Sequence, residues 1–328
     1  MKTVLVTGAT GLVGANVCER LLKQGDRVRA IARKPEGPDA VALRELGVDI
    51  LPGDIADAGC VKVATEGVDG VIHTAALRGM AGVTIADSVS ANVMGTINVL
   101  TAALMAGGVP VVQLLTGTFF NVWDAPQSEQ SPLDLLFINK DPYSLTKRLA
   151  FLEGLARVEV GQDIRFMQPG AAYGPSPCLA NAMFQNFNTG LAWAIRGEVD
   201  PKMPMPLAYV LADDCAYVSV AALEKGVKGE RFLAKGRQQD VATIAGITNR
   251  ACEIAGVSHR VAEVSKDQLD DPDVVAKFGA TMISLAKRTY PEPLFDSSIT
   301  EERLGYVPTS LTDGLTTTID WMRGNGFI

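Results

Sequence analysis

The sequence has few of the residues that build metal centres or disulfide frameworks. Its 328 residues include only two histidines, His73 and His259, which lie far apart in the chain and are too few for a zinc site. The five cysteines are odd in number, and no two have C-x-x-C spacing. We therefore expect no metal, and cysteines that are small buried side chains in a reducing, cytoplasmic setting.

The sequence also lacks a basic excess and a long uninterrupted apolar segment. A net charge of -7 argues against nucleic acid and anionic membranes as partners. The longest apolar run, residues 99–116, contains Gly107, Gly108 and Pro110, which divide it into a helix end and a strand. Three glycines by position 14, followed by charged residues at 19 and 20, do not suit a cleavable signal. We expect no membrane-spanning helix.

A strand, a glycine-rich turn and a helix open the chain. Residues 2–7 form a short β-branched apolar run, and apolar residues recur at helical spacing from Val13 until Gly25. Glycines between such elements let the backbone approach a pyrophosphate, which the helix N-terminus also favours. The turn therefore predicts a dinucleotide site. Its expected residues are Gly8, Thr10, Gly11, Leu12 and Val13.

The end of the second expected strand, residues 27–32, indicates which dinucleotide. Arg33 and Lys34 follow this strand, nineteen residues after Gly14, and no acidic residue stands there. An acid at this point would bind the 2′-hydroxyl of NAD, whereas an arginine accommodates the 2′-phosphate of NADP. NADP(H) is the preferred cofactor and NAD(H) the alternative. The alternative is that both are solvated loop cations.

Strands and helices continue to alternate. Helices are expected at 39–46, 61–65 and 85–106, and strands at 48–51, 68–74 and 109–115. This pattern predicts an α/β fold, a doubly wound parallel sheet (Rossmann fold) whose ligands bind beyond the carboxyl ends of the strands. There the small Ala75 and Ala76 would let a cofactor lie close, and His73 is expected to be a core histidine. We place a dinucleotide-binding domain at 1–168 and a smaller, mainly substrate-binding lobe at 169–328, some of whose segments return to the first domain.

A tyrosine and a lysine stand one helical turn apart at Tyr143 and Lys147. Residues at i and i+4 share a helix face, and a nearby ammonium favours a phenolate, as proton exchange with an alcohol requires. A chance pair on an exposed helix is the alternative. Thr116 and Thr118 follow the strand at 109–115 and could donate hydrogen bonds to a substrate oxygen, or could simply be strand and turn residues.

With these motifs in order, the chain resembles the extended short-chain dehydrogenase/reductase superfamily, in its NAD(P)-dependent epimerase/dehydratase group. Residues 32–35, residues 229–232, and residues 304–306 with Trp321 make it most similar to the dihydroflavonol-reductase-like branch. The motifs that carry the resemblance are residues 7–14, 53–55, 71–76, Asn92 with 95–98, Tyr143 with Lys147, and Pro169-Gly170 with 173–175.

The resemblance implies a role for each matched residue. Tyr143 would be the general acid/base, and Lys147 would bind the nicotinamide ribose and lower the pKa of the tyrosine. Thr118 would hold the substrate oxygen, with Thr116 as the alternative. The family also implies a homodimer. The other implied cofactor residues are Asp54 and Ile55 by the adenine, Pro169 and Gly170 by the nicotinamide, and Thr74, Ala75, Ala76, Asn92 and Thr116.

Besides Gly117-Thr118, where the family usually shows a serine pair, the chain departs from the family pattern at two points, and the second of these bears on the substrate. Gln168 stands where the family often has an arginine, so an ion pair at that point is in doubt. The arginine that would clamp a nucleotide-sugar diphosphate before residues 208–214 is missing, with Arg196 and Lys202 the nearest cations. A small-molecule substrate that is fairly apolar, with a carbonyl or secondary alcohol, is therefore favoured.

Two other functions stay open at this point. One is a sugar or nucleotide-sugar epimerase or dehydratase that oxidises its cofactor only transiently, and the other is a non-catalytic NADP(H)-binding protein. Phe119, Phe120 and Trp123 could wall the site or pack under the loop that follows. The length of that loop, residues 123–141, suggests a cover over the site.

Overall fold

The fold is built around a seven-stranded sheet. The computed structural model describes residues 1–78, 83–122, 124–135, 141–184 and 186–328, without the side chains of residues 280 and 281. Its strands are β1 (Thr3–Thr7), β2 (Arg27–Ala32), β3 (Asp49–Pro52), β4 (Gly70–His73), β5 (Val111–Leu114), β6 (Ile164–Pro169) and β10 (Arg231–Ala234). Their order is β10-β6-β5-β4-β1-β2-β3, and each pairing is parallel. The order reverses between β1 and β4, which confirms the doubly wound fold and places a crevice at their carboxyl ends.

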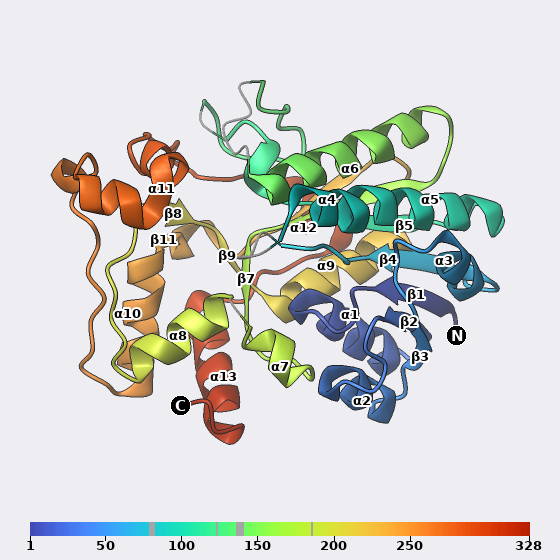
Figure 1. The fold of residues 1–328 in the computed structure, drawn as a ribbon, viewed down its shortest axis with the longest axis horizontal. Coiled ribbons are helices and arrows are strands. Elements are labelled where there is room, and N and C mark those ends of the chain that lie inside the picture. Colours follow the sequence, from blue (N-terminus) through green and yellow to red (C-terminus); the bar gives the residue numbers. More distant parts are fainter. Residues whose placement is uncertain (79–82, 123, 136–140, 185) are drawn as a thin grey trace.

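Helices cover both faces of this sheet (Figure 1). Side chains alternate between the faces along a strand, so that Val4 and Val6 join one apolar core and Leu5 the other. Because both faces are buried, the strands are nearly continuous apolar runs, which is why the sequence locates them. The first core is covered by α1 (Leu12–Lys23), α2 (Pro38–Glu45) and α9 (Ala212–Lys225), and the second by α3 (Ala58–Thr65), α5 (Gly95–Met105) and α6 (Pro142–Glu159).

The helix expected over 85–106 is wound in three pieces. It begins as α4 (Ile85–Ser88), passes through a π-helical turn, η1 (Val89–Met94), and continues as α5. Such turns are inserted where a helix must present a side chain at an unusual angle, often near functional sites. The stretch Ile85–Met105 is also apolar and long enough to cross a membrane, but 44% of its tested window is buried. Core helices pass the same test.

The second half of the chain builds a smaller lobe, on the left of Figure 1. Met203 and Met205 are buried in one of its apolar clusters, so they are core residues. Its paired strands are β7 (Ala171–Tyr173) with β9 (Tyr209–Leu211), and β8 (Pro206–Leu207) with β11 (Ala242–Thr243). Its helices are α7 (Leu179–Ala182), α8 (Phe187–Ile195), α10 (Ile244–Ala255), α11 (Pro272–Ala286) and α13 (Leu311–Gly324).

Some segments after residue 168 belong to the large sheet instead. β10 pairs with β6, α9 packs beside α1, and α12 (Ser298–Leu304) packs on α9 and β10. Short 3-10 turns complete the described elements: η2 (Gly117–Phe119), η3 (Gln238–Asp240) and η4 (Lys266–Gln268).

Candidate active site

The segment that runs from the end of β1 into the first turn of α1 accepts only glycine at two positions. A Cβ at Gly14 would lie 2.2 Å from the Gly8 oxygen, and one at Gly8, where φ is +71°, would lie 2.6 Å from the Ala75 backbone. Gly11 precedes α1 and offers no side-chain cap, so the first N–H groups of that helix are left for an anion. This cradle fits the pyrophosphate of a dinucleotide. The predicted cofactor residues that it contains are Gly8, Thr10, Gly11, Leu12 and Val13.

The end of β4 borders this cradle. The Thr74 hydroxyl donates a hydrogen bond of 2.7 Å to the Thr7 carbonyl at the end of β1. The backbone of Ala75 lies against Gly8, and Ala76 is exposed. The three predicted residues after β4 thus lie at the carboxyl edge of the sheet, next to the glycine turn.

The loops after β2 and β3 form the neighbouring part of this edge. Arg33 and Lys34 are exposed directly after β2, and among the described residues neither forms an ion pair. Asp54 and Ile55 follow β3, and the Asn98 amide holds the Ile55 carbonyl at 2.9 Å. Because β2 and β3 are paired, the two cations and Asp54-Ile55 lie on adjacent loops, as an adenosine site requires.

His73 is a core residue, as predicted. Its ring nitrogens bond the hydroxyls of Thr7 at 2.6 Å and Thr96 at 3.0 Å, and its side chain is buried. Burial and the nearby charge of Lys147 lower the pKa of His73 to about 3. The ring is therefore neutral at physiological pH and is not a proton donor to a substrate.

The start of α6 fixes the tyrosine and lysine of the predicted pair. The Asp141 carboxylate accepts a 3.0 Å hydrogen bond from the Ser144 backbone N–H, and Pro142 begins the helix, which are common signals for a helix start. Tyr143 therefore lies in the first turn and Lys147 in the second. The expected helical spacing of the pair is present.

Lys147 is buried at the back of the site. Only 4% of the residue is exposed, and its ammonium donates a hydrogen bond of 2.6 Å to the Leu114 carbonyl at the end of β5. Burial without an acidic partner lowers the pKa of Lys147 to about 8. The contact ties α6 to the strand that carries the candidate threonines.

The Thr116 side chain lies beside the Tyr143 phenol, close enough to act on its pKa. Burial raises the pKa of Tyr143, and the Thr116 side chain and the charge of Arg78 oppose this rise. Thr118 lies two residues further on, in η2, with its hydroxyl oxygen buried. Of the two threonines that the sequence leaves open, Thr116 is the one that contacts the phenol, and the assignment of Thr118 to the substrate oxygen stays a prediction.

Asn92, expected to bind the cofactor, is used for another contact. Its side chain lies in the π-helical turn, with 1% of the residue exposed. Its oxygen accepts from the Leu77 N–H at 2.6 Å, and its nitrogen donates to the Leu77 carbonyl at 3.0 Å and to the Thr146 hydroxyl at 2.9 Å. Asn92 thus joins the segment after β4 to α6.

The end of β6 brings Pro169 and Gly170 to the same edge. A Cβ at Gly170 would lie 2.3 Å from the Ala208 oxygen, so the close approach of the backbone just before β9 requires glycine. Before them, Gln168 is fully buried, and neither atom of its amide has a hydrogen-bond partner in the described part of the chain. The ion pair that the family arginine would make is absent at this residue.

The aromatic residues after Thr118 are packing residues. Phe119 and Phe120 are buried and contact Phe151 with ring centroids 5.6 and 5.4 Å apart. A groove of about 510 Å³ beside Phe120 and α12 contains none of the predicted site residues. Trp123 lies outside the described residues.

The described part of the loop that was expected to cover the site is bonded to β10 and α12. Residues 123 and 136–140 lie outside the described residues. Arg231 of β10 donates 2.7 Å to the Ser131 carbonyl, and the Glu129 carboxylate accepts from the Thr300 N–H at 3.0 Å. These contacts fix residues 129–131 to β10 and α12 at the edge of the sheet.

Sequence reasoning missed three contacts between the lobes. The Asn181 amide donates 3.0 Å to the Thr10 carbonyl in the glycine turn, and the Asp39 carboxylate accepts from the Ala180 and Asn181 N–H groups, each at 3.0 Å. Arg78, beyond β4, donates 3.1 Å to the Phe184 carbonyl. In the sequence, the one local feature that could have drawn attention to Arg78 is that it is a lone charged residue just after the small residues Ala75 and Ala76.

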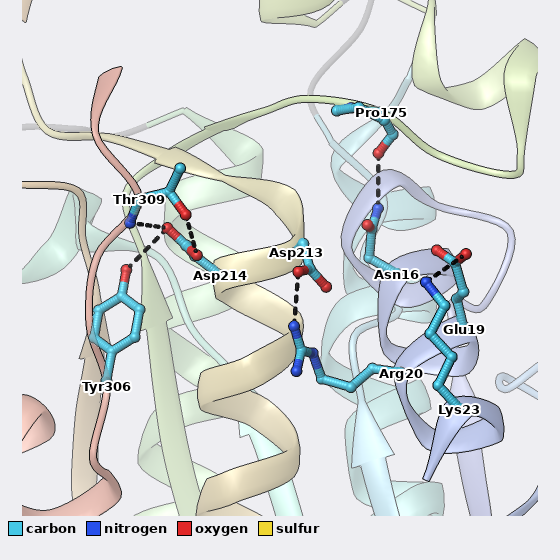
Figure 2. A network of polar contacts seen from close by, with 9 residues as sticks. All are labelled: Asn16, Glu19, Arg20, Lys23, Pro175, Asp213, Asp214, Tyr306 and Thr309. Carbon is cyan, nitrogen blue, oxygen red and sulfur yellow. Dashed lines mark hydrogen bonds and ion pairs between the residues drawn. The ribbon is translucent and has the colours of Figure 1, made fainter. Parts of the chain in front are cut away.

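A polar network anchors α1 against the second half of the chain (Figure 2). Arg20 of α1 pairs with Asp213 of α9 at 2.7 Å, and the Asn16 amide donates 3.0 Å to the Pro175 carbonyl. Asp214, next along α9, accepts from the Thr309 N–H at 2.9 Å. These bonds join the helix that follows the glycine turn to the segments leading into the smaller lobe.

Comparisons with known proteins agree with this geometry. The model of the NAD dependent epimerase/dehydratase family matches residues 4–234. Sterol demethylase protein B of Methylococcus capsulatus is 30% identical over 99% of this chain and 100% of its own length. A putative dihydroflavonol 4-reductase of Synechocystis is 26% identical, covering 98% and 95%. The crystal structure of gox2253 covers 100% of both chains with a TM-score of 0.85 and 25% identity.

The predicted family and the enzyme class are both confirmed by these matches. The chain belongs to the NAD dependent epimerase/dehydratase family and is an NAD(P)-dependent oxidoreductase of the extended short-chain dehydrogenase/reductase type.

Proposed function

We propose that this chain transfers hydride between NADP(H) and the carbonyl or secondary alcohol carbon of a small, fairly apolar substrate. The observation that carries the proposal is the placement of the Tyr143 phenol beside the Thr116 side chain, at the carboxyl edge of β5. Lys147 lies buried on the next turn of the same helix. Such a hydroxyl pair can orient a substrate oxygen and exchange a proton with it.

In the reducing direction, Tyr143 gives its proton to the developing alkoxide oxygen. Thr116 lies beside the phenol and orients it, and we assign to Thr118, two residues further on, the role of holding that oxygen. Lys147 contributes a buried positive charge behind the pair and ties α6 to β5 through the Leu114 carbonyl. When bound, the nicotinamide supplies or accepts the hydride. The variants Thr116→Val and Thr118→Val distinguish the two threonines. Loss of the hydroxyl that holds the substrate oxygen should cause the larger fall in kcat/KM for the ketone.

The preference for NADP(H) rests on Arg33 and Lys34. Both side chains are exposed at the end of β2, beside the loop of Asp54 and Ile55. A 2′-phosphate bound there would meet two positive charges. NAD-binding enzymes usually carry an acidic residue at this position, and this chain has none there.

The substrate class rests on the charges of the smaller lobe and on the relatives. Arg196 pairs with Glu198 at 3.6 Å and donates to the Phe327 carbonyl, so it is engaged away from a diphosphate. The full-length relatives are named for a sterol and a dihydroflavonol, both of them ring systems with oxygen functions. A cyclic ketone or alcohol is the substrate class we propose.

We also propose that the protein is a homodimer formed through α4–α5 and α6. Large apolar side chains are exposed on these adjacent helices, with Met94 at 47%, Leu149 at 42% and Leu152 at 40%. Burying such a surface between two copies removes it from water. Light scattering should give a dimer for the parent chain and a monomer for Leu152→Arg. A monomeric parent would contradict the proposal.

The experiment that tests the proposed function follows NADPH and NADH absorbance against a panel of steroid ketones, flavanones, aliphatic ketones and nucleotide sugars. We expect NADPH consumption with a cyclic ketone, abolished in Tyr143→Phe. Conversion of a nucleotide sugar without net NADPH consumption would overturn the proposal in favour of an epimerase.

A further inference from the structure

A short segment after β7 is bonded to the dinucleotide-binding domain. We call this segment, residues 178–184, the strap; it contains α7. The Asp39 carboxylate of α2 accepts from the Ala180 and Asn181 N–H groups, each at 3.0 Å. The Asn181 side-chain amide donates 3.0 Å to the Thr10 carbonyl in the glycine turn. The strap is therefore attached both to α2 and to the turn that forms the cofactor cradle.

The points of attachment follow three adjacent strands of the large sheet. Asp39 comes after β2 and Thr10 after β1. Arg78 comes after β4, and its guanidinium donates 3.1 Å to the Phe184 carbonyl at the end of the strap. The three strands are neighbours in the order β4-β1-β2, and a dinucleotide crevice opens at their carboxyl ends. The strap therefore runs along this carboxyl edge. In Figure 1, α7 lies between the smaller lobe and α2, on which it packs.

The strap is bonded to the smaller lobe through its carbonyl groups. The Ala182 carbonyl accepts from the Asn186 amide at 2.7 Å and from the Asn188 amide at 3.0 Å. The Met183 carbonyl accepts 2.7 Å from the Thr189 hydroxyl. All three donors belong to the start of α8 and its cap. The strap thus connects α8 of the smaller lobe with the edge of the large sheet.

The strap has little stability of its own. Its helix, α7, has four residues, and so short a helix does not persist without tertiary contacts. Cys178, at the N-cap, does not cap the helix with its side chain, so the Asp39 carboxylate caps the first N–H groups from another helix. An element that depends on a few polar bonds can open locally while the rest of the fold stays intact.

The bond to Thr10 places the strap next to the dinucleotide. Thr10 precedes Gly11 and the first N–H groups of α1, where the pyrophosphate would bind. A dinucleotide in this crevice would extend from the loop after β2 to the end of β4. The strap follows the same edge between the same two points, so it would lie against the bound cofactor along much of its length.

We propose that the strap closes the dinucleotide crevice and that its opening limits both the entry and the release of the cofactor. Asp39 and Asn181 are positioning residues that hold it closed. Because the strap is also bonded to α8, exchange of the cofactor is coupled to the position of the smaller lobe. The inference concerns the binding of the cofactor alone and goes beyond the proposed function.

Stopped-flow fluorescence of NADPH with the full-length chain tests the strap. Mixing gives the association rate constant, and displacement by excess NADP+ gives the dissociation rate constant. Asn181→Ala removes the bond to Thr10 from an exposed side chain. A weaker strap is open more often in the free and in the bound protein alike. We therefore expect both rate constants to rise about 5–10-fold, the effect of one lost hydrogen bond, with Kd nearly unchanged. NADH, displaced by NAD+, should show the same rises, because it carries the same pyrophosphate.

Two further variants complete the experiment. Asp39→Asn keeps the size of the side chain but leaves one acceptor oxygen for two N–H groups, so it should raise both rate constants as well. Asn325→Ala is the matched control. It also removes an exposed amide, one that donates 2.8 Å to the Trp321 carbonyl at the end of α13, and it should leave both rate constants unchanged. Should Asp39→Asn not fold, Asn181→Ala decides alone.

Two results with Asn181→Ala would overturn the proposal. Unchanged rate constants would make the strap a permanent brace, and a rise in the dissociation rate constant alone would make it a contact of the bound cofactor and not a gate. Neither measurement uses a substrate. A chain that failed to reduce any ketone would refute the proposed function and leave these rate constants as the test of the strap.

Hydrogen exchange of the protein without cofactor follows the opening itself. The amide hydrogens of Ala180 and Asn181 are bonded to Asp39, so they exchange when the strap opens. Mass spectrometry of a peptide covering residues 178–184 should show exchange about 5–10-fold faster in Asn181→Ala than in the parent, with a peptide from β1 unchanged. Equal exchange of the strap peptide in the two proteins would also overturn the proposal.

Discussion

Replacing Lys147 with methionine should stabilise the protein while removing its activity. The ammonium is buried, and burial lowers its pKa from 10.5 to about 8. A shift of that size corresponds to about 3 kcal/mol, since each pKa unit is worth about 1.4 kcal/mol. The buried charge at Lys147 therefore opposes folding under physiological conditions.

The sign of the pH dependence follows from the lowered pKa. Between the folded-state value of about 8 and the ordinary value of 10.5, the unfolded chain binds the proton and the folded chain does not. The cost of the charge is therefore fully present below about pH 8 and disappears toward about pH 10.5, so stability rises with pH across that window.

The methionine variant escapes this cost but loses a hydrogen bond. Without the ammonium, the Leu114 carbonyl has no donor from residue 147, which costs about 1–2 kcal/mol. We expect Lys147→Met to be more stable than the parent by about 1–2 kcal/mol near pH 7, and less stable by at most about 1 kcal/mol near pH 10, where most unfolded chains still carry the charge. The difference between the two proteins should thus change by about 2–3 kcal/mol.

Lys235 provides a matched control. It is equally buried, with 4% of the residue exposed, its pKa is also lowered to about 8, and its ammonium makes a longer contact of 3.4 Å with the Pro169 carbonyl. Lys235→Met should show the same pH-dependent gain in stability. Turnover should fall at least about 100-fold in Lys147→Met but stay within about tenfold in Lys235→Met.

The assay is urea unfolding of the three proteins without cofactor at several pH values, with turnover measured in parallel. Titrations elsewhere in the chain are common to all three and cancel in the differences. The reasoning is refuted if the stability of Lys147→Met runs parallel to that of the parent from about pH 7 to pH 10.

The remaining predictions concern the cofactor and the buried amide. Gly14→Ala puts a Cβ 2.2 Å from the Gly8 oxygen, so NADPH affinity in a fluorescence titration should fall at least about tenfold; Gly190→Ala, with no atom within 4 Å of the new Cβ, should keep it and gain about 0.5–1 kcal/mol. Unchanged affinity in Gly14→Ala contradicts the cradle. Exchanging Arg33 for serine should raise the KM for NADPH about tenfold without changing that for NADH, and equal effects on both would remove the preference. Gln168→Met should add about 1 kcal/mol of stability in urea, because the buried amide lacks partners among the described residues; a loss would mean that the amide is satisfied.

The fold could be predicted from the sequence because its signals are local. The strands of the sheet are apolar runs, the glycine turn has fixed spacing, and the second strand ends at Ala32 as expected. The prediction of a helix over 85–106 was right in extent, but it did not include the π-helical turn. That turn depends on the contacts of Asn92 with Leu77 and Thr146, which are distant in sequence.

The site was predictable in its residue types but less so in its contacts. Tyr143 and Lys147 follow from helical spacing. The contact of Lys147 is a backbone carbonyl, and carbonyls carry no sequence signal. Thr116 and Thr118 differ by only two residues, and which one meets the phenol depends on how the chain turns into η2. Arg78 reaches its partner Phe184 across 106 residues of sequence, so only the assembled fold brings them together.

The most direct test of the central claim follows the hydride itself. NADPH carrying deuterium at both positions of nicotinamide C4 is incubated with the best ketone of the panel, and the product alcohol is analysed by mass spectrometry. We predict that the parent places deuterium on the carbinol carbon as NADPH is consumed, and that Tyr143→Phe, which still binds NADPH, forms no product. Product without deuterium, or deuterated product formed by Tyr143→Phe at the parent rate, would contradict the account.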